Sequence, residues 1–181
     1  MRPRATRDPL ANPEPLIQRV YSYAAYRLGA GPDAEDVTSE VFERALRYRG
    51  SYDPTRAEPI AWLLGIAQRC ANAALTARAA AAQLPEHVDA VAPGNVAEEA
   101  LRRIELGDAL GRLSERDQEL IALRFGADLT AKQIAAVLEL RTNAAEVALH
   151  RALDRLRSIL TEDEQVAGDT PRTAVPGARA V

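Results

Sequence analysis

Residues 129–157 constrain the fold of this chain more than any other stretch, because they hold two helical patterns joined by only four residues. The first pattern opens with Thr130 and Gln133, a spacing at which side-chain oxygen atoms and free backbone N–H groups satisfy one another at a helix start. Where the apolar phase breaks, Thr142 or Asn143 can cap the second helix. Two helices joined this tightly are typical of a helix-turn-helix.

Both helical patterns have an apolar face and a polar face. We expect the apolar positions to face the core, and they are Ile134, Val137, Leu138, Leu149, Leu153, Leu156 and Leu160. The free arc of the second helix holds Asn143, Val147, His150, Arg151, Asp154 and Ser158. Val147, at the centre of that arc, is either an incidental exposed residue or an apolar contact for a thymine methyl group in a DNA major groove. The pattern favours DNA binding, although antiparallel helix pairs also occur in bundles that bind nothing.

The composition favours an all-helical protein. Of the 181 residues, 47% are hydrophobic, which is enough to build real cores, and only 4% are aromatic. No window has the sustained apolar alternation at a period of two residues that indicates half-buried β-strands. We therefore expect an all-α fold of two small helical domains, the second of which contains the helix-turn-helix.

The charge and the scarcity of metal-binding residues exclude several classes of function. With 23 basic and 26 acidic residues the net charge is −3, so nonspecific nucleic-acid binding is disfavoured and any DNA site must be local. One cysteine and two distant histidines predict neither a disulfide framework nor a metal site, and we expect no cofactor. No apolar run is long enough to cross a bilayer and no signal peptide is recognisable, which predicts a cytoplasmic protein without a membrane partner.

Changes in composition divide the chain into five segments. Prolines among small and charged residues predict a disordered lead-in at 1–15, followed by a first helical domain at 16–78. Residues 79–95 contain prolines and a glycine but no amphipathic stripe, which predicts a flexible linker. A second helical domain is expected at 96–160, and the aperiodic segment 161–181 is predicted to be a disordered tail.

Three helices are expected in the first domain, at 16–28, at 32–49 and from about residue 60 to residue 78. The second has an apolar arc of Ala34, Val37, Val41, Ala45 and Tyr48, widened by Phe42 and Leu46. Its opposite arc is mixed in charge, which on pattern alone is typical of solvated surface, and holds Asp36, Ser39, Glu40, Glu43, Arg44 and Arg47. In the third helix Trp62 and Cys70 are expected in a small core. The polar side of that helix holds Gln68, Arg69, Asn72 and Thr76.

Several motifs occur in an order that resembles one protein family. They are AEDVTSEVFERALR (34–47), AWLLGIAQR (61–69), LSERDQELIALRF (113–125), and IAAVLEL with ALHRALDRLR (134–140 and 148–157). In this order and spacing they resemble the extracytoplasmic-function (ECF) group of bacterial RNA polymerase sigma factors. The resemblance covers about residues 16–160. It implies that the first domain is sigma region two and that the second is sigma region four.

The resemblance also implies partners and site residues. Region two would dock on the clamp coiled coil of the beta-prime subunit of core RNA polymerase, and region four would sit on the beta flap. The implied polymerase-binding residues are Asp36, Val37, Ser39, Glu40, Phe42 and Glu43. The implied contacts with promoter DNA are Arg69 and Asn72 at the minus-ten element, and Thr142, Asn143, Glu146, Val147, His150 and Arg151 at the minus-thirty-five element. The linker would thread toward the polymerase active site, no small-molecule substrate is implied, and an anti-sigma factor is an open partner.

Some positions depart from the pattern of the family. The family often has glutamine in place of Ser39, an acidic residue in place of Ala73 and arginine near Thr76. A basic residue is frequent where Glu146 and Ala148 stand. The promoter preference is therefore not transferable, and we expect DNA binding to be weak without the polymerase.

Two other classes of function compete with a sigma factor. A helix-turn-helix regulator would normally need a dimer surface or a ligand pocket, and neither is evident in the sequence. A helical interaction protein that titrates a partner would suit the acidic balance of the chain. An enzyme is disfavoured, because there is no glycine-rich phosphate loop and Cys70 has no histidine near it in sequence.

Overall fold

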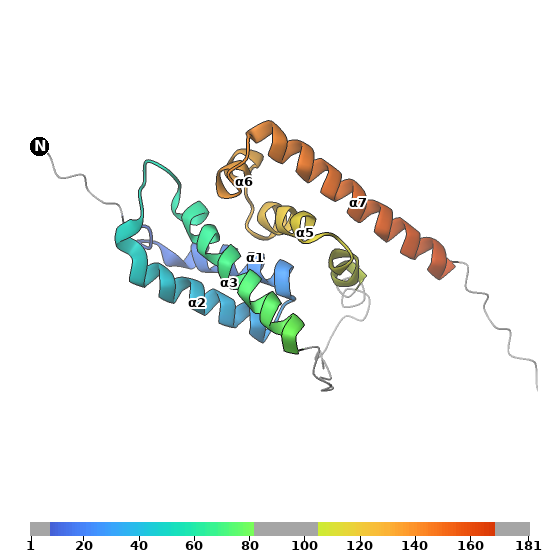
Figure 1. Ribbon diagram of the computed structural model, residues 1–181, viewed down its shortest axis with the longest axis horizontal. Coiled ribbons are helices and arrows are strands. Elements are labelled where there is room, and N and C mark those ends of the chain that lie inside the picture. Colours follow the sequence, from blue (N-terminus) through green and yellow to red (C-terminus); the bar gives the residue numbers. More distant parts are fainter. Residues whose placement is uncertain (1–7, 82–104, 169–181) are drawn as a thin grey trace, which may run out of the picture.

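The computed structural model describes residues 8–81 and 105–168, with side chains through residue 162, and within these ranges its regular elements are helices (Figure 1). The predicted all-α fold is confirmed. The elements of the first domain are α1 (Pro13–Leu28), α2 (Pro32–Tyr48), the short 3-10 turn η1 (Arg49–Ser51) and α3 (Pro59–Ala81). Those of the second are α5 (Glu115–Ile121), the π-helical turn η2 (Ala122–Gly126), α6 (Ala131–Val137) and α7 (Thr142–Gly168), preceded by the helical residues 105–111.

Prolines begin the helices of the first domain. Pro13 and Pro32 lie in the first turns of α1 and α2, where the N–H group that proline lacks would have no helical partner. Because α1 begins at Pro13, the predicted lead-in is wrong at its C-terminal end. The third helix continues to Ala81, into the predicted linker, and the rest of that linker lies outside the described residues.

The core of the first domain is formed by one face of each helix. Its fully buried large side chains are Val20 and Tyr23 of α1, Val41 of α2, and Leu63 and Leu64 of α3. A buried side chain of this size stabilises the fold by about 1.5–3 kcal/mol. Cys70 is buried and free, as predicted, and burial raises the pKa of its thiol, with a further rise from the charge of Glu40.

The end of α2 departs from the predicted apolar arc. Tyr48 is 56% exposed and Leu46 is 57% exposed, so neither belongs to the core. The chain turns at η1 and brings Tyr52, which is only 7% exposed, against the ring of Trp62 at a centroid distance of 5.5 Å. Tyr52 therefore fills the space that the helical pattern assigned to Tyr48.

Local capping fixes the helices of the second domain. The Oγ atom of Ser114 accepts a hydrogen bond from the Asp117 backbone N–H group at 3.2 Å and caps α5. Thr130 and Gln133 form a reciprocal capping box at the start of α6. The capping box at Thr130 was predicted from sequence, because a capping motif depends only on residues three positions apart.

The turn between α6 and α7 is closed by a left-handed residue. Glu139 has φ 54°, and the N–H group of the next residue, Leu140, donates to the Ala135 carbonyl at 2.8 Å. This pairing satisfies a carbonyl group that the helix end leaves free. The last helix begins at Thr142, and the Arg141 carbonyl accepts its first bond, so the cap lies one residue before the predicted position.

The apolar stripe of α7 packs against α5 and α6. Ala145 and Ala152 are fully buried on it. The residues that pack beside them are only partly buried, and they are Ala148, Leu149, Leu153, Leu156 and Ile159. The helix continues to Gly168, so the predicted tail is wrong for residues 161–168.

The two domains lie against each other in the structure. α1 packs on η2 and α5, and α3 packs on α6, so that α5 and α6 cover one side of the first domain (Figure 1). Buried apolar residues of both domains form one continuous core. In the described part of the chain, none of the helices has both the length and the apolar character needed to span a membrane.

Candidate polymerase-binding and DNA-binding surfaces

An acidic groove lies between α2 and α3. Its volume is about 480 Å³, and short alanine side chains on α3 leave it open. The lining residues are Asp33, Asp36, Val37 and Glu40 of α2, and Ala74, Ala77, Arg78 and Ala81 of α3. Carboxylates on one wall make the groove suited to a basic partner surface.

The predicted polymerase-binding residues divide into an exposed set and a packed set. Asp36, Ser39 and Glu43 are exposed, and the half-exposed Glu40 forms an ion pair with Arg44 one helical turn away. The packed residues differ, because Val37 is 4% exposed and Phe42 packs partly against the core. Since their side chains face inward, Val37 and Phe42 hold α2 in place, which leaves the exposed carboxylates and Ser39 for a partner.

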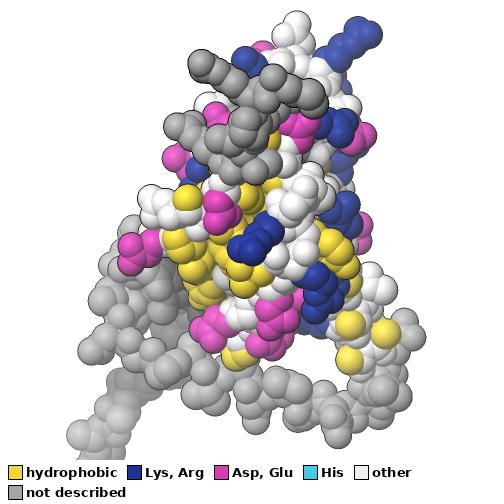
Figure 2. Space-filling view, turned by 90° about the vertical axis from the view of Figure 1, so that its left-hand side faces the viewer, with side chains coloured by type: hydrophobic (Ala, Val, Ile, Leu, Met, Phe, Trp, Pro, Cys, Tyr) yellow, Lys and Arg dark blue, Asp and Glu magenta, His cyan; other side chains and the backbone are white. Residues whose placement is uncertain are grey.

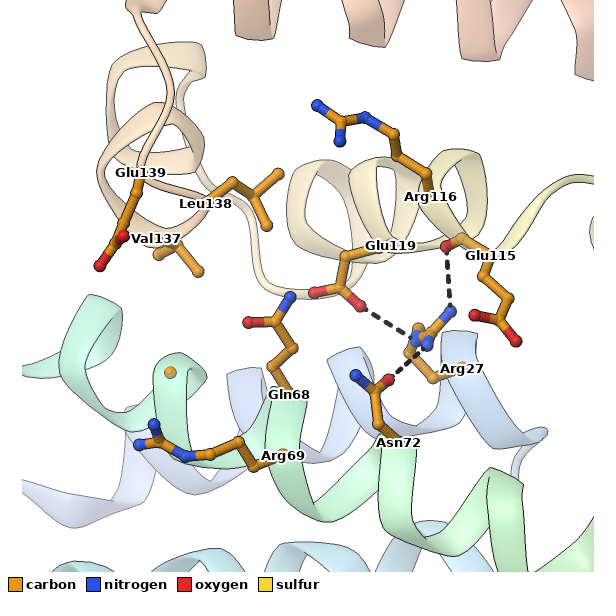
Figure 3. A pocket seen from close by; sticks show the side chains of 11 residues that line it. Arg27, Gln68, Arg69, Asn72, Glu115, Arg116, Glu119, Val137, Leu138 and Glu139 are labelled. Atoms are coloured by element: carbon orange, nitrogen blue, oxygen red, sulfur yellow. Dashed lines mark hydrogen bonds and ion pairs between the residues drawn. The ribbon is translucent and has the colours of Figure 1, made fainter.

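The predicted minus-ten residues line a cavity between the two domains. This cavity of about 610 Å³ is bounded by α1, α3, α5 and α6 (Figure 3). Gln68, Arg69 and Asn72 of α3 form one wall. The side chain of Asn72 accepts a hydrogen bond from Arg27 Nη2 at 2.9 Å, so this face of α3 already has an intramolecular partner.

A second cavity, which sequence reasoning missed, lies at the end of α2. Its volume is about 300 Å³, and aromatic and basic side chains share its walls. The lining residues are Arg44, Tyr48, Ser51, Trp62, Ile66 and Arg69. Aromatic rings beside guanidinium groups can stack an unpaired base and contact its phosphate. The sequence signal was hidden because the helical pattern placed Tyr48 in the core.

The end of the molecule seen in Figure 2 carries charges of both signs and is neither wholly acidic nor wholly basic. Apolar side chains are exposed there between acidic and basic side chains of both signs. This distribution agrees with the small net charge of −3 and means that a nucleic acid at this end would depend on individual side chains for its contacts.

The free arc of α7 is exposed as predicted. The predicted minus-thirty-five residues are all exposed, whether on this arc or beside it, and they are Thr142, Asn143, Glu146, Val147, His150 and Arg151. Val147 is 50% exposed at the centre of this arc. The imidazole Nε2 of His150 lies 3.3 Å from Asp154 Oδ2, one turn further along the helix.

An ion pair at the flank of the free arc anchors α7 to α5. Arg155 Nη1 donates to both carboxylate oxygens of Asp117, at 2.9 and 2.8 Å. Asp117 is only 5% exposed and also accepts a hydrogen bond from the Ser114 hydroxyl at 2.8 Å. No sequence pattern indicated this tertiary contact, which orients the free arc outward.

A polar cluster of Tyr23, Arg27 and Glu119 is buried where α1 meets α5. The Tyr23 hydroxyl lies 2.9 and 2.8 Å from the two carboxylate oxygens of Glu119. Arg27 Nε forms an ion pair with Glu119 Oε2 at 3.1 Å, at an angle that does not fit a hydrogen bond. Arg27 also donates to Asn72 and to the backbone carbonyl of Glu115 (Figure 3).

Burial governs the acidity of this polar cluster. It raises the pKa of Glu119 above its ordinary value, an effect that the positive charge of Arg27 opposes. Burial also raises the pKa of Tyr23 well above its ordinary value, and the Glu119 charge raises it further. No sequence pattern indicated this cluster, because its members lie in different domains.

Comparison with known families covers both domains. Residues 14–80 match the model of sigma-70 region 2, and residues 103–156 match that of sigma-70, region 4. The chain is 32% identical over 150 residues to the ECF RNA polymerase sigma factor BldN of Streptomyces coelicolor, a match that spans 80% of this chain and 57% of BldN. The chain thus spans little more than half the length of that relative.

A second relative matches over most of its own length. The ECF RNA polymerase sigma factor SigD of Mycobacterium tuberculosis is 33% identical over 163 residues, which cover 84% of this chain and 76% of SigD. Among solved structures, the sigma factor RpoE of Bartonella quintana, crystallised with the anti-sigma factor NepR, has a TM-score of 0.64 at 20% identity. That match covers 82% of this chain and 93% of the RpoE chain, and it concerns the fold alone. The chain therefore belongs to the ECF family of RNA polymerase sigma factors.

Proposed function

We propose that this chain acts as a sigma subunit that binds core RNA polymerase and directs transcription initiation to a subset of promoters. The observation that carries the proposal is the free face of α7. Asn143, Val147, His150 and Arg151 are exposed along that face. The opposite side of the helix is held by apolar packing, and its flank is held by the ion pair with Asp117. A helix that is anchored on one side and free on the other can enter a major groove without losing its fold.

The contacts of α7 with the minus-thirty-five element follow from its side chains. Asn143 can pair with an adenine, Arg151 can reach a guanine edge or a phosphate, and Val147 can touch a thymine methyl group. Glu146 is exposed beside this arc, and its carboxylate would repel the phosphates of the DNA and weaken the binding of the helix. DNA binding by the isolated chain should therefore be weak and should depend on the polymerase.

The minus-ten element would be bound by the first domain. Arg69 lies between the two cavities, and it can pair with a phosphate from either side. The rings of Tyr48 and Trp62 offer a stacking surface for a base that has left the duplex. Asn72 can then pair with a base edge once its bond to Arg27 is released.

Polymerase binding is assigned to the acidic groove of α2 and α3. Asp36, Ser39, Glu40 and Glu43 would contact the clamp coiled coil of the beta-prime subunit, while the second domain sits on the beta flap. Tethering the two DNA-binding faces through one polymerase raises the effective concentration of each contact.

The chain itself catalyses no reaction in this proposal, and RNA synthesis remains with the core enzyme. It would act in the cytoplasm, where core polymerase and promoter DNA are found. The related RpoE was crystallised with an anti-sigma factor, and we propose that a protein of that class also binds this chain.

Run-off transcription on a library of genomic promoters tests the proposal. Core polymerase supplemented with the chain should yield transcripts from a defined subset of templates, and core polymerase alone should yield none from that subset. Identical transcripts with and without the chain, together with no co-purification with core polymerase, would rule out a sigma subunit. Specific binding of the chain to a promoter without polymerase would instead indicate an ordinary helix-turn-helix regulator.

A further inference from the structure

The contact between the two domains requires a glycine. Gly126, at the end of η2, lies directly against α1, where a Cβ atom would be 2.9 Å from the Ser22 carbonyl oxygen and 2.9 Å from Tyr23 Cα. Both atoms belong to the α1 backbone, which cannot yield as a flexible side chain would. A larger residue at this position therefore fits only if the two domains move apart.

Arg19 ties the same part of α1 to the second domain. Its Nε donates to the Ala127 carbonyl at 2.7 Å, and its Nη2 donates to the Asp128 carbonyl at 3.1 Å. These carbonyls belong to the segment that follows η2. Arg19 and Gly126 thus hold the two sides of one close backbone contact, and the buried polar cluster of Tyr23, Arg27 and Glu119 lies beside it on α1 and α5.

This arrangement brings the two predicted DNA-binding faces close together. Gly65 of α3 and Glu139, in the turn between α6 and α7, line the same cavity of about 610 Å³. Three residue steps, or at most roughly 11 Å, lead from Glu139 to the start of α7. Arg151, at the far end of the arc, lies about 14 Å further along the helix.

The two promoter elements cannot be reached at the same time from this arrangement. Elements centred at minus ten and minus thirty-five are separated by about 25 base pairs, or roughly 85 Å of B-form DNA. This step rests on the proposed function. The two faces must therefore separate before the chain can use both elements, and the Asn72 side chain must lose its bond to Arg27.

We propose that the free chain is self-inhibited: Gly126, Arg19 and the polar cluster hold its two domains in a closed form that keeps Asn72 bonded to Arg27 and the two DNA-binding faces too close together to use both promoter elements. Opening exposes apolar surface from the shared core, and polymerase binding has to offset that cost. The apparent affinity for polymerase is then lower than the intrinsic affinity by the fraction of molecules that are open.

The polar cluster makes the closed form specific without making it permanent. An ion pair buried between two domains gains little net stability, because the cost of removing its charges from water offsets much of their attraction. When the domains separate, Arg27, Glu119 and the Tyr23 hydroxyl return to water and recover their hydration. A wholly apolar interface of the same size would lack this compensation.

Small-angle X-ray scattering of the full chain tests the closed form. A compact chain of this length has a radius of gyration of about 16 Å, to which the termini add equally in all variants. Gly126→Ala and Arg19→Ala should each raise the radius of gyration by several ångströms while the helical circular dichroism is unchanged. Gly65→Ala is the matched control, because this helical glycine lines the cavity between the domains but its Cβ would meet nothing within 4 Å.

Titration with core polymerase gives the functional readout. Gly126→Ala should reach half-maximal binding at a several-fold lower polymerase concentration than the wild type, and Gly65→Ala should match the wild type. Equal radii of gyration for the wild type, Gly126→Ala and Arg19→Ala would overturn the closed form, and so would an equal expansion of Gly65→Ala. If Gly126→Ala loses helicity, the radius of Arg19→Ala decides. If the variants expand as expected but the wild type binds no polymerase, the closed form stands and the proposed function is rejected.

Discussion

Single side chains of α7 separate promoter reading from folding. Val147 is 50% exposed at the centre of the free arc, whereas Leu153 packs against the core on the opposite side. A charge at the first position meets water in the free protein and phosphates in the complex. A charge at the second position is placed among apolar side chains.

Val147→Asp should abolish promoter-specific transcription while changing the free energy of unfolding by no more than about 0.5 kcal/mol. Binding to core polymerase should stay near normal, since the substitution lies outside the acidic groove. Run-off transcription, urea denaturation and a polymerase pull-down measure the three quantities. Leu153→Asp is the comparison, and it should cost about 1–3 kcal/mol of stability. Normal transcription by Val147→Asp would show that this arc does not read DNA.

The buried carboxyl of Glu119 makes the domain contact sensitive to pH. Its pKa is raised by burial, and the groups that face it are Arg27 and Tyr23 of α1. An acid whose pKa is higher in the folded than in the unfolded chain contributes stability below its ordinary pKa of 4.5, and that contribution is lost as the pH rises through the raised pKa. The raised pKa of Tyr23 acts in the same direction above its ordinary value of 10.0.

Glu119→Gln should therefore flatten part of the pH dependence of stability. The free energy of unfolding of the wild type, minus that of the variant, should fall as the pH rises from about 4.5 toward neutrality. Urea denaturation at a series of pH values measures this difference, and subtraction removes the other titrating groups common to both proteins. A difference that is constant with pH would mean that Glu119 titrates alike in the folded and unfolded chains.

Individual helices show which features a sequence can predict. The cap at Thr130 and the free arc of α7 were predicted correctly, because they depend on residues within one or a few helical turns. The end of α2 was not, because η1 folds back and lets Tyr52 replace Tyr48 beside Trp62. That failure also hid the aromatic cavity, the one part of the candidate minus-ten surface that sequence reasoning missed.

The orientation of α7 depends on its ion pair with α5. Arg155→Ala leaves the Asp117 carboxylate, which is 5% exposed, with only the Ser114 side chain and its own helix end as partners. Loss of a partner for a buried charged group costs about 1–3 kcal/mol. Thermal or urea denaturation should show this loss, together with reduced promoter specificity.

Arg157→Ala is the matched control for this prediction. Arg157 pairs with the exposed Asp154 on its own helix at 3.1 Å, and exposed pairs of this kind contribute at most about 0.5 kcal/mol. Equal destabilisation by the two substitutions would mean that Asp117 does not anchor α7.

The acidic groove can be tested independently of DNA. Reversing Asp36 and Glu40 to lysine should weaken core polymerase binding at least several-fold, because two attractive charges become repulsive toward a basic partner. Helical circular dichroism should be unchanged, since neither residue belongs to the core. Glu14→Lys with Glu105→Lys gives the same change in net charge at exposed positions outside the groove. If the two double variants weaken polymerase binding equally, the effect comes from the overall charge of the chain and not from the groove.

At the scale of the whole molecule, the docking of the two domains could not be predicted from the sequence. Arg27 and Glu119 lie in different domains, and no helical period or cap connects them. The sequence predicted two domains and a linker, and family membership agrees with that division. How the domains meet follows from long-range complementarity: a glycine against a backbone, two carbonyls against a guanidinium group, and a buried carboxylate against Arg27 and Tyr23.

A polar pair at the surface of the same interface offers a reciprocal test of the closed form. Gln133 Nε2 of α6 donates to Glu58 Oε2, just before α3, at 2.7 Å. Gln133 also accepts from the Thr130 N–H group through Oε1, and glutamate can keep this second role in the capping box. Gln133→Glu therefore leaves the start of α6 intact but sets two carboxylates against each other across the domain contact.

Gln133→Glu should shift the chain toward the open form, seen as a larger radius of gyration at low ionic strength. The shift should shrink with added salt, because an exposed pair is screened. Adding Glu58→Gln should restore compaction, since an amide then donates to the new carboxylate and the polarity of the bond is reversed. Glu58→Gln alone should remain compact, because two amides can still form a hydrogen bond. If the double variant is as expanded as Gln133→Glu alone, the expansion arises within α6, and the pair of Gln133 and Glu58 does not stabilise the domain contact.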